Sequence, residues 1–106
     1  MVSMDKISHF GQQIGQTFHP EKVLLFGSFT RDAETEDSDV DLLVVMNFTG
    51  KAHRIATRIR SRLRPDFPLD LLVRTPGQIR QRLDMGDCFI KEITQKGTVL
   101  YEAAHT

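Results

Sequence analysis

Several features that define common protein classes are scarce in this sequence of 106 residues. Its single cysteine, Cys88, excludes an intrachain disulfide and fits a reducing compartment. Its longest aliphatic run, residues 42–46, is far too short to cross a bilayer, and residues 1–10 lack the apolar stretch of a secretion signal. We therefore predict a cytoplasmic protein that does not contact a membrane.

The sequence also lacks an excess of charge of either sign, because 14 lysines and arginines balance 14 aspartates and glutamates. A module dedicated to DNA or RNA is usually basic, so this balance argues against nucleic acid as the main partner. It does not exclude a nucleotide, since a small ligand needs only a local site. The length suits one domain with a modest core, and we expect residues 1–106 to form a single domain.

Motifs of several well-known chemistries are missing as well. No glycine-rich segment ends in Gly-Lys-Ser or Gly-Lys-Thr, so the sequence has no Walker A motif. The histidines are scattered and do not show the spacing of zinc ligands. Cys88 stands among apolar residues of a helical pattern, and we expect it to lie in the core without a catalytic histidine partner.

Apolar residues recur along the chain with the spacings of amphipathic helices and short strands. Steps of three and four residues indicate helices, whereas short runs rich in leucine and valine indicate strands. The predicted helices span residues 3–18, 29–32, 51–63, 75–83 and 89–96, and the predicted strands span residues 23–26, 40–46, 69–73 and 98–101. Thr75 and Gln78 form a capping box, and Gly97 is a predicted C-terminal cap. We predict an α/β (α+β) protein with a small mixed sheet and helices packed on it.

Three aspartates stand at the beginnings of apolar strands. Asp39 and Asp41 flank Val40 at the start of one strand, and both project to the same side because strand side chains alternate. Asp70 lies inside an otherwise apolar strand, where a lone charge would be costly unless paired or metal-bound. If the two strands are neighbours, the three carboxylates can hold Mg²⁺, as a pair of ions that clamps an in-line phosphoryl displacement.

Gly27 and Ser28 follow the predicted strand 23–26 and suit a phosphate group. A glycine lets the backbone approach a phosphate closely. The backbone N–H groups of a following helix favour anions, and the Ser28 hydroxyl can add a hydrogen bond. The sequence thus places a phosphate-binding turn and a carboxylate cluster within one short region.

These residues resemble a known signature. Gly27-Ser28, ten further residues, and Asp39-Val40-Asp41 are similar to the motif of the DNA polymerase β-like nucleotidyltransferases. The fuller run of residues 26–44 and the Leu100-Tyr101 ending resemble the minimal nucleotidyltransferase (MNT) subfamily. These small proteins are commonly paired with a HEPN-domain protein in prokaryotic toxin–antitoxin modules. The resemblance covers residues 23–101 and implies the polymerase β-like nucleotidyltransferase fold.

The resemblance implies a role for each acidic residue of the motif. Asp39 and Asp41 would bind the metal ions. Asp70 would complete the metal site and help to remove the proton of the acceptor hydroxyl. All three residues are therefore candidate catalytic residues and candidate metal ligands.

The resemblance also implies nucleotide-binding residues. Gly27 and Ser28 would hold the triphosphate, and Arg31 matches a position that is usually basic. Asp32 stands where the family often has glycine, and an added carboxylate there would weaken anion binding if it faced the site.

The function implied by the resemblance is Mg²⁺-dependent transfer of AMP from ATP to a hydroxyl on a partner protein. The partner would be a HEPN toxin, and the chain would act as its antitoxin. The length leaves no room for a separate acceptor-binding domain, which also favours an acceptor carried by another protein. Two alternatives stay open: an antitoxin that neutralises its partner by binding alone, and a transferase for a small molecule. Assembly as a homo-oligomer or a hetero-oligomer is also left open.

One segment is strongly basic. Residues 51–64 contain no acid and carry six cations: Lys51, Arg54, Arg58, Arg60, Arg62 and Arg64. We interpret them as the solvated face of an amphipathic helix. Contact with an acidic partner or with RNA is the alternative.

Overall fold

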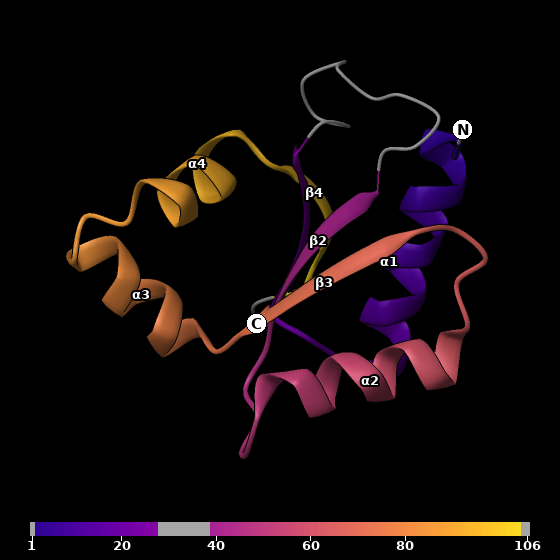
Figure 1. Cartoon of the computed structure of the whole chain (residues 1–106), viewed down its shortest axis with the longest axis horizontal. Coiled ribbons are helices and arrows are strands. Elements are labelled where there is room, and N and C mark those ends of the chain that lie inside the picture. Colours follow the sequence, from indigo (N-terminus) through magenta and orange to yellow (C-terminus); the bar gives the residue numbers. More distant parts are fainter. Residues whose placement is uncertain (1, 28–38, 105–106) are drawn as a thin grey trace.

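The structure, a computed structural model, describes residues 2–27 and 39–104. Its elements are α1 (Met4–Phe18), β1 (Lys22–Phe26), β2 (Val40–Val45), α2 (Ala52–Leu63), β3 (Leu69–Arg74), α3 (Pro76–Asp84), α4 (Cys88–Lys96) and β4 (Thr98–Glu102) (Figure 1). The helices and strands expected within the described residues are confirmed, with bounds that differ by one or two residues. The predicted helix 29–32 and the polar loop that follows it lie outside the described residues.

The four described strands form one mixed sheet in the order β3-β2-β1-β4. Strand β1 runs antiparallel to both β2 and β4, whereas β2 and β3 are parallel and are joined through α2. Residues 42–45 of β2 are buried, as the continuous apolar run of this strand predicts. The α/β fold with a small mixed sheet is therefore confirmed.

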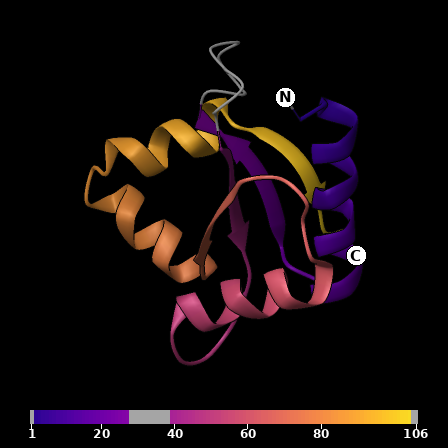
Figure 2. The same ribbon diagram turned by 45° about the vertical axis from the view of Figure 1, so that its right-hand side comes forward.

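Helices cover both faces of the sheet (Figures 1 and 2). On one face α1 and α2 pack over the larger core; its buried members include Ile7, Phe10, Ile14, Leu25, Leu42, Ile55 and Ile59. On the other face α4 covers a smaller core of Leu24, Leu43, Val45, Ile90 and Ile93. Because strand side chains alternate, the odd-numbered residues of β2 face α4. None of the helices in the described ranges is long and apolar enough to cross a membrane.

Local sequence signals explain where the helices end. The backbone of His19 has a φ of 53° and that of Arg64 a φ of 48°, and these residues end α1 and α2. Each residue precedes a proline, which disfavours the right-handed helical conformation at that position. Helix α3 begins with the predicted capping box. The Thr75 hydroxyl accepts from the backbone N–H of Gln78 at 3.1 Å, and the side-chain amide oxygen of Gln78 accepts from the backbone N–H of Thr75 at 2.9 Å.

Candidate active site

Two of the predicted aspartates meet across neighbouring strands. The parallel register of β2 and β3 pairs Asp41 with Asp70, so the condition under which these carboxylates can meet is fulfilled. By strand alternation both carboxyl groups belong to the α4 face of the sheet. The two side chains lie close enough for a protonated Asp41 carboxyl to donate a hydrogen bond to the Asp70 carboxylate. When both groups are ionised, their negative charges repel each other.

The environment of Asp41 disfavours its negative charge. Burial raises the pKa of this carboxyl most, the charges of Asp70 and Asp39 raise it further, and so does a hydrogen bond that the protonated Asp41 carboxyl can donate to Asp70. Asp39 immediately precedes β2 and is exposed, as is Asp70, whereas Asp41 is half-buried. All three carboxyl groups therefore act on one small region of the sheet, as the alternation of the Asp-Val-Asp motif predicts. A cation placed there would relieve the repulsion that raises the pKa of Asp41.

The donor atoms of this cluster fit magnesium. Among the described residues, no group of three or more histidine, cysteine or acidic side chains is arranged to hold a metal ion by itself. Mg²⁺ is usually bound through one or two carboxylates and completes its shell with water and substrate phosphates. The ionised carboxylates of Asp41 and Asp70 match that donor set, so these residues fit a magnesium site whose remaining ligands would be water and phosphate oxygens.

Gly27 brings the end of β1 close to this pair. Its φ is +81°, a conformation that side chains other than glycine rarely adopt, and its neighbour Phe26 pairs with Asp41 in the sheet. A Cβ atom built on Gly27 would collide with the Asp41 carboxylate and would lie 3.2 Å from its Cγ atom. Only glycine therefore allows the chain to turn directly against the carboxylate. The other predicted nucleotide-binding residues, Ser28 and Arg31, lie outside the described residues, as does Asp32.

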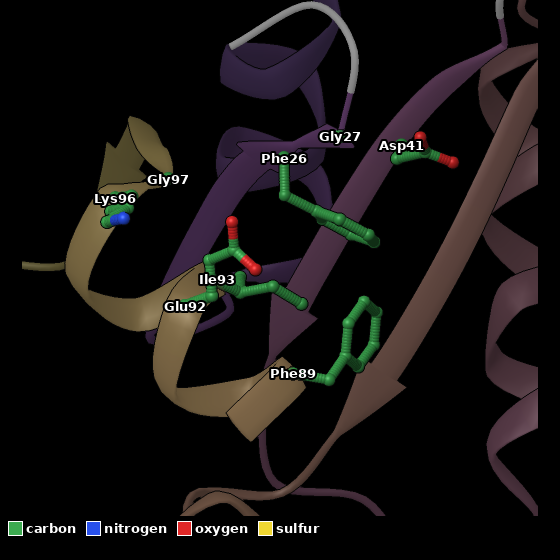
Figure 3. Close-up of a pocket in the computed structure, with 8 residues that line it drawn as sticks. All are labelled: Phe26, Gly27, Asp41, Phe89, Glu92, Ile93, Lys96 and Gly97. Carbon is green, nitrogen blue, oxygen red and sulfur yellow. The ribbon is translucent and has the colours of Figure 1, made fainter. Parts of the chain in front are cut away.

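A pocket of about 300 Å³ opens beside Asp41 (Figure 3). Its lining comes from the end of β1, from β2 and from one side of α4: Phe26, Gly27, Asp41, Phe89, Glu92, Ile93, Lys96 and Gly97. The rings of Phe26 and Phe89 meet edge to face, with centroids 5.7 Å apart and an interplanar angle of 82°. The pocket thus combines an aromatic wall with a carboxylate of the acidic cluster.

Helix α4 lies close on β1 because of Gly97. This residue is the C-cap of α4, as predicted, and its N–H donates to the Ile93 carbonyl oxygen, but its φ of −67° and ψ of 154° are extended and not left-handed. Glycine is required for a different reason. A Cβ atom at this position would collide with the Ile93 carbonyl oxygen and would lie 3.1 Å from the Leu25 carbonyl oxygen of β1. The close approach of these two elements forms the end wall of the pocket.

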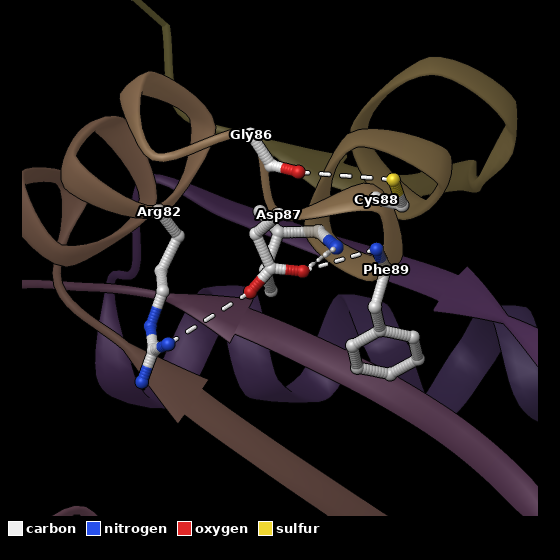
Figure 4. Close-up of polar contacts among 6 residues, drawn as sticks. Arg82, Gly86, Asp87, Cys88 and Phe89 are labelled. Atoms are coloured by element: carbon white, nitrogen blue, oxygen red, sulfur yellow. Dashed lines mark hydrogen bonds and ion pairs between the residues drawn. The ribbon is translucent and has the colours of Figure 1, made fainter.

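The start of α4 is fixed by a side-chain cap (Figure 4). One carboxylate oxygen of Asp87 accepts from the backbone N–H groups of Phe89 at 3.0 Å and Ile90 at 3.1 Å. The other oxygen lies 4.0 Å from a guanidinium nitrogen of Arg82 on α3. These contacts set the direction in which α4 leaves the turn, and with it the position of Phe89 beside the pocket.

Cys88 is exposed, so the prediction that it lies in the core is wrong. Ile90 and Ile93 are the buried residues of α4, and the helix rotation that buries them turns Cys88 toward solvent. Its sulfur lies 3.7 Å from the Gly86 carbonyl oxygen (Figure 4).

Comparison with known proteins identifies the family. The sequence profile described as "Polymerase beta, Nucleotidyltransferase" matches residues 11–106. The chain belongs to this family. In the structure of this nucleotidyltransferase-family chain, Asp41 on β2 is paired with Asp70 on β3. This pairing agrees with the motif resemblance found in the sequence.

Two solved structures share the fold of this chain. A protein of Sulfolobus solfataricus assigned as a nucleotidyltransferase has a TM-score of 0.62 and 18% identity, over 92% of this chain and 78% of that one. A toxin–antitoxin crystallised with AMP-PNP has a TM-score of 0.51 and 18% identity, over 96% of this chain and 75% of that one. At such identities the likeness concerns the fold. No curated protein matches this nucleotidyltransferase-family chain.

Sequence reasoning missed three residues of the pocket: Phe89, Glu92 and Lys96. They recur at steps of three and four and so share one side of α4, but this spacing equally describes a solvated helix face. Their contact with the acidic site depends on how α4 packs against β1. No periodicity within α4 could reveal this packing.

The basic segment of this nucleotidyltransferase-family chain, residues 51–64, lies on the side of the sheet away from Asp41. All six of its cations are exposed on α2 and its flanks, and within the described parts of the chain they form no ion pair. Arg60 donates to the Leu69 carbonyl oxygen at 2.6 Å. The interpretation as a solvated helix face agrees with this exposure, and contact with an acidic partner stays a prediction.

Proposed function

We propose that the protein is a Mg²⁺-dependent nucleotidyltransferase that transfers AMP from ATP to a hydroxyl group of a partner protein. The partner would be a HEPN-domain toxin, and the modification would make the chain its antitoxin. The observation that carries the proposal is the paired carboxyl groups of Asp41 and Asp70 beside Gly27, in a chain of the polymerase β nucleotidyltransferase family. The toxin–antitoxin neighbour with AMP-PNP supports the choice of an adenine nucleotide and a protein partner.

The carboxylates of Asp39, Asp41 and Asp70 would hold the magnesium. When bound, the ions supply positive charge to the phosphate oxygens and to the pyrophosphate that leaves. The repulsion that raises the pKa of Asp41 is the reason the cluster favours a cation over three free negative charges.

Asp70 would accept the proton of the incoming hydroxyl. It is exposed and lies on β3, one of the two edge strands of the sheet, so an acceptor group can reach it from outside the molecule. In the transfer, the hydroxyl oxygen forms a bond to the α-phosphorus and its proton passes to the Asp70 carboxylate. The bond from the α-phosphorus to the oxygen bridging to the β-phosphate breaks, and pyrophosphate leaves.

Gly27 would leave room for the triphosphate. Without a side chain, its backbone lies directly against the Asp41 carboxylate, so phosphate oxygens can reach backbone and carboxylate-bound magnesium together. Contacts from Ser28 and Arg31 to the triphosphate stay predictions from the motif. A cytoplasmic location also stays a prediction.

Transfer of label from ATP tests the proposal. The protein is incubated with Mg²⁺ and ATP labelled at the α-phosphate, with and without the product of the adjacent gene. We expect label on the partner protein, and we expect it to disappear in an Asp39→Asn/Asp41→Asn double variant but to persist in Asp84→Asn, a matched change of an exposed aspartate on α3. A stable complex without label would contradict the enzymatic proposal and favour an antitoxin that acts by binding alone. Label on a small molecule but not on protein would contradict the proposed acceptor.

A further inference from the structure

The pocket beside Asp41 lies on the side of this residue that faces Gly27, not on the side that faces Asp70. In the strand order β3-β2-β1-β4, Asp41 lies on β2 between Asp70 on one side and Gly27 on the other. The pocket is lined from the Gly27 side, by β1 and α4, and Asp70 does not line it. The side of Asp41 proposed for the acceptor hydroxyl is therefore not the side on which the pocket lies.

The pocket wall is built for a flat apolar group. The Phe89 side chain is 54% exposed, although α4 buries Ile90 and Ile93 in the core of this face. An exposed phenyl ring is unfavourable in water, yet the Asp87 cap and the edge-to-face contact with Phe26 hold it in place. The pocket volume of about 300 Å³ is at the lower end of the range for small-molecule sites.

Charged groups border the aromatic wall. Glu92 and Lys96 follow Phe89 along α4 and line the same pocket, so charged side chains of both signs border the apolar wall. An apolar wall with a few polar groups at its margin is the usual composition of a site for an aromatic ligand with polar edges. A nucleoside has this chemistry, with a flat base and polar ring and sugar atoms.

We propose that this pocket binds the nucleoside part of the donor nucleotide, with the base against Phe89 and Phe26 and the phosphates directed past Gly27 to the carboxylates. The inference rests on the proposed function and adds the part of the chain that contacts the base. An aromatic side chain of the acceptor protein is the other occupant with suitable chemistry. It is disfavoured because the pocket lies on the Gly27 side of Asp41, whereas Asp70, the proposed proton acceptor for the hydroxyl, lies on the other side.

Binding of two ligands that differ only by the nucleoside tests the inference. Affinities for ATP and for inorganic tripolyphosphate, each with Mg²⁺, are measured by calorimetry on the full chain and on Phe89→Ala. We expect the variant to bind ATP about 5- to 100-fold more weakly, the scale of losing one aromatic partner of a base, and to bind tripolyphosphate as the unmodified protein does. Phe89→Tyr keeps the ring and should restore ATP binding.

Two further variants separate pocket effects from general effects. Met85→Ala changes a side chain that is 69% exposed on the turn between α3 and α4 and does not line the pocket, so its ATP affinity should be unchanged. Phe89→Leu keeps apolar volume without an aromatic face and replaces Phe89→Ala if thermal unfolding shows that the alanine variant does not fold.

The outcomes distinguish the pocket from the function. Equal losses for ATP and tripolyphosphate, or no loss for either, would overturn the assignment of the pocket to the nucleoside while leaving nucleotide binding intact. Unchanged ATP affinity with a raised KM for the partner protein would assign the pocket to the acceptor instead. Failure of the unmodified protein to bind either ligand would overturn both the pocket assignment and the proposed function.

Discussion

Replacing Asp70 by asparagine should make the metal-free protein more stable. The pKa of Asp41 is raised from its ordinary value of 3.8 by burial, by the charges of Asp70 and Asp39 and by the hydrogen bond with Asp70. The folded state therefore binds more protons than the unfolded state, and stability falls as the pH rises from the unfolded pKa through the raised one. The full cost is present at pH values above the raised pKa of Asp41. In Asp70→Asn one negative charge disappears, and the new amide can donate to the Asp41 carboxylate.

The size of this effect follows from the separation and exposure of the charges. Two like charges about 4 Å apart repel by about 1 kcal/mol in water and by about 4 kcal/mol at the effective dielectric constant of a protein surface. Asp70 is exposed, so the lower value applies. For a domain of about 100 residues, 1 kcal/mol raises the Tm by about 4 °C. We therefore expect Asp70→Asn to raise the Tm by about 4 °C near pH 8 in a chelator, and the gain to vanish in acid as Asp41 becomes protonated.

Thermal unfolding followed by circular dichroism measures this, with and without Mg²⁺ across the pH range. Added Mg²⁺ should raise the Tm of the unmodified protein and should have a smaller effect on Asp70→Asn, because one carboxylate of the metal site is gone. Asp84→Asn removes an exposed charge on α3 and serves as the control. A lower Tm for Asp70→Asn near pH 8 in the chelator, or a magnesium effect as large as that of the unmodified protein, would refute the reasoning.

Three further substitutions test how the site is held in place. Gly27→Ala should lower the free energy of unfolding by about 1–3 kcal/mol and reduce nucleotide transfer, because the φ of Gly27 is +81° and the added Cβ atom meets the Asp41 carboxylate. Urea titration measures the loss of stability. An unchanged unfolding midpoint would argue against the close contact. Asp87→Ala should cost about 1 kcal/mol through loss of the α4 cap, whereas Asp87→Asn, which can still cap, should cost less. Gly97→Ala should cost about 1–3 kcal/mol, since the Ile93 carbonyl oxygen occupies the space that a Cβ needs; a Tm equal to that of the unmodified protein would show that α4 can move off the sheet.

The acidic half of the site could be predicted because it depends on local patterns. Alternation along β2 places Asp39 and Asp41 on one side of the strand, whatever the rest of the fold. The apolar residues around Asp70 indicate a strand, but the place of this strand beside β2 is only a condition of the prediction from sequence. The register that sets Asp41 beside Asp70 fulfils that condition.

The aromatic half could not be predicted because it depends on the rotation of a helix. In α4 the run Cys88-Phe89-Ile90 offers three adjacent apolar residues, and the sequence does not state which of them faces the sheet. Packing buries Ile90 together with Ile93, and it leaves Cys88 and Phe89 exposed. The same rotation that made the prediction for Cys88 wrong brings Phe89 to the pocket.

The pairing of β1 with β4 has a consequence for how the protein folds. The register that joins Lys22 to Glu102 and Leu25 to Thr98 connects segments far apart in the sequence. Closing so long a loop costs entropy before any contact repays it, and such remote pairings slow folding to about milliseconds or longer. Helix α4 leads directly into β4, so the two walls of the pocket meet only when this pairing forms. In refolding experiments we therefore expect the ability to bind ATP to appear with the slowest phase, after most of the helical signal has been regained.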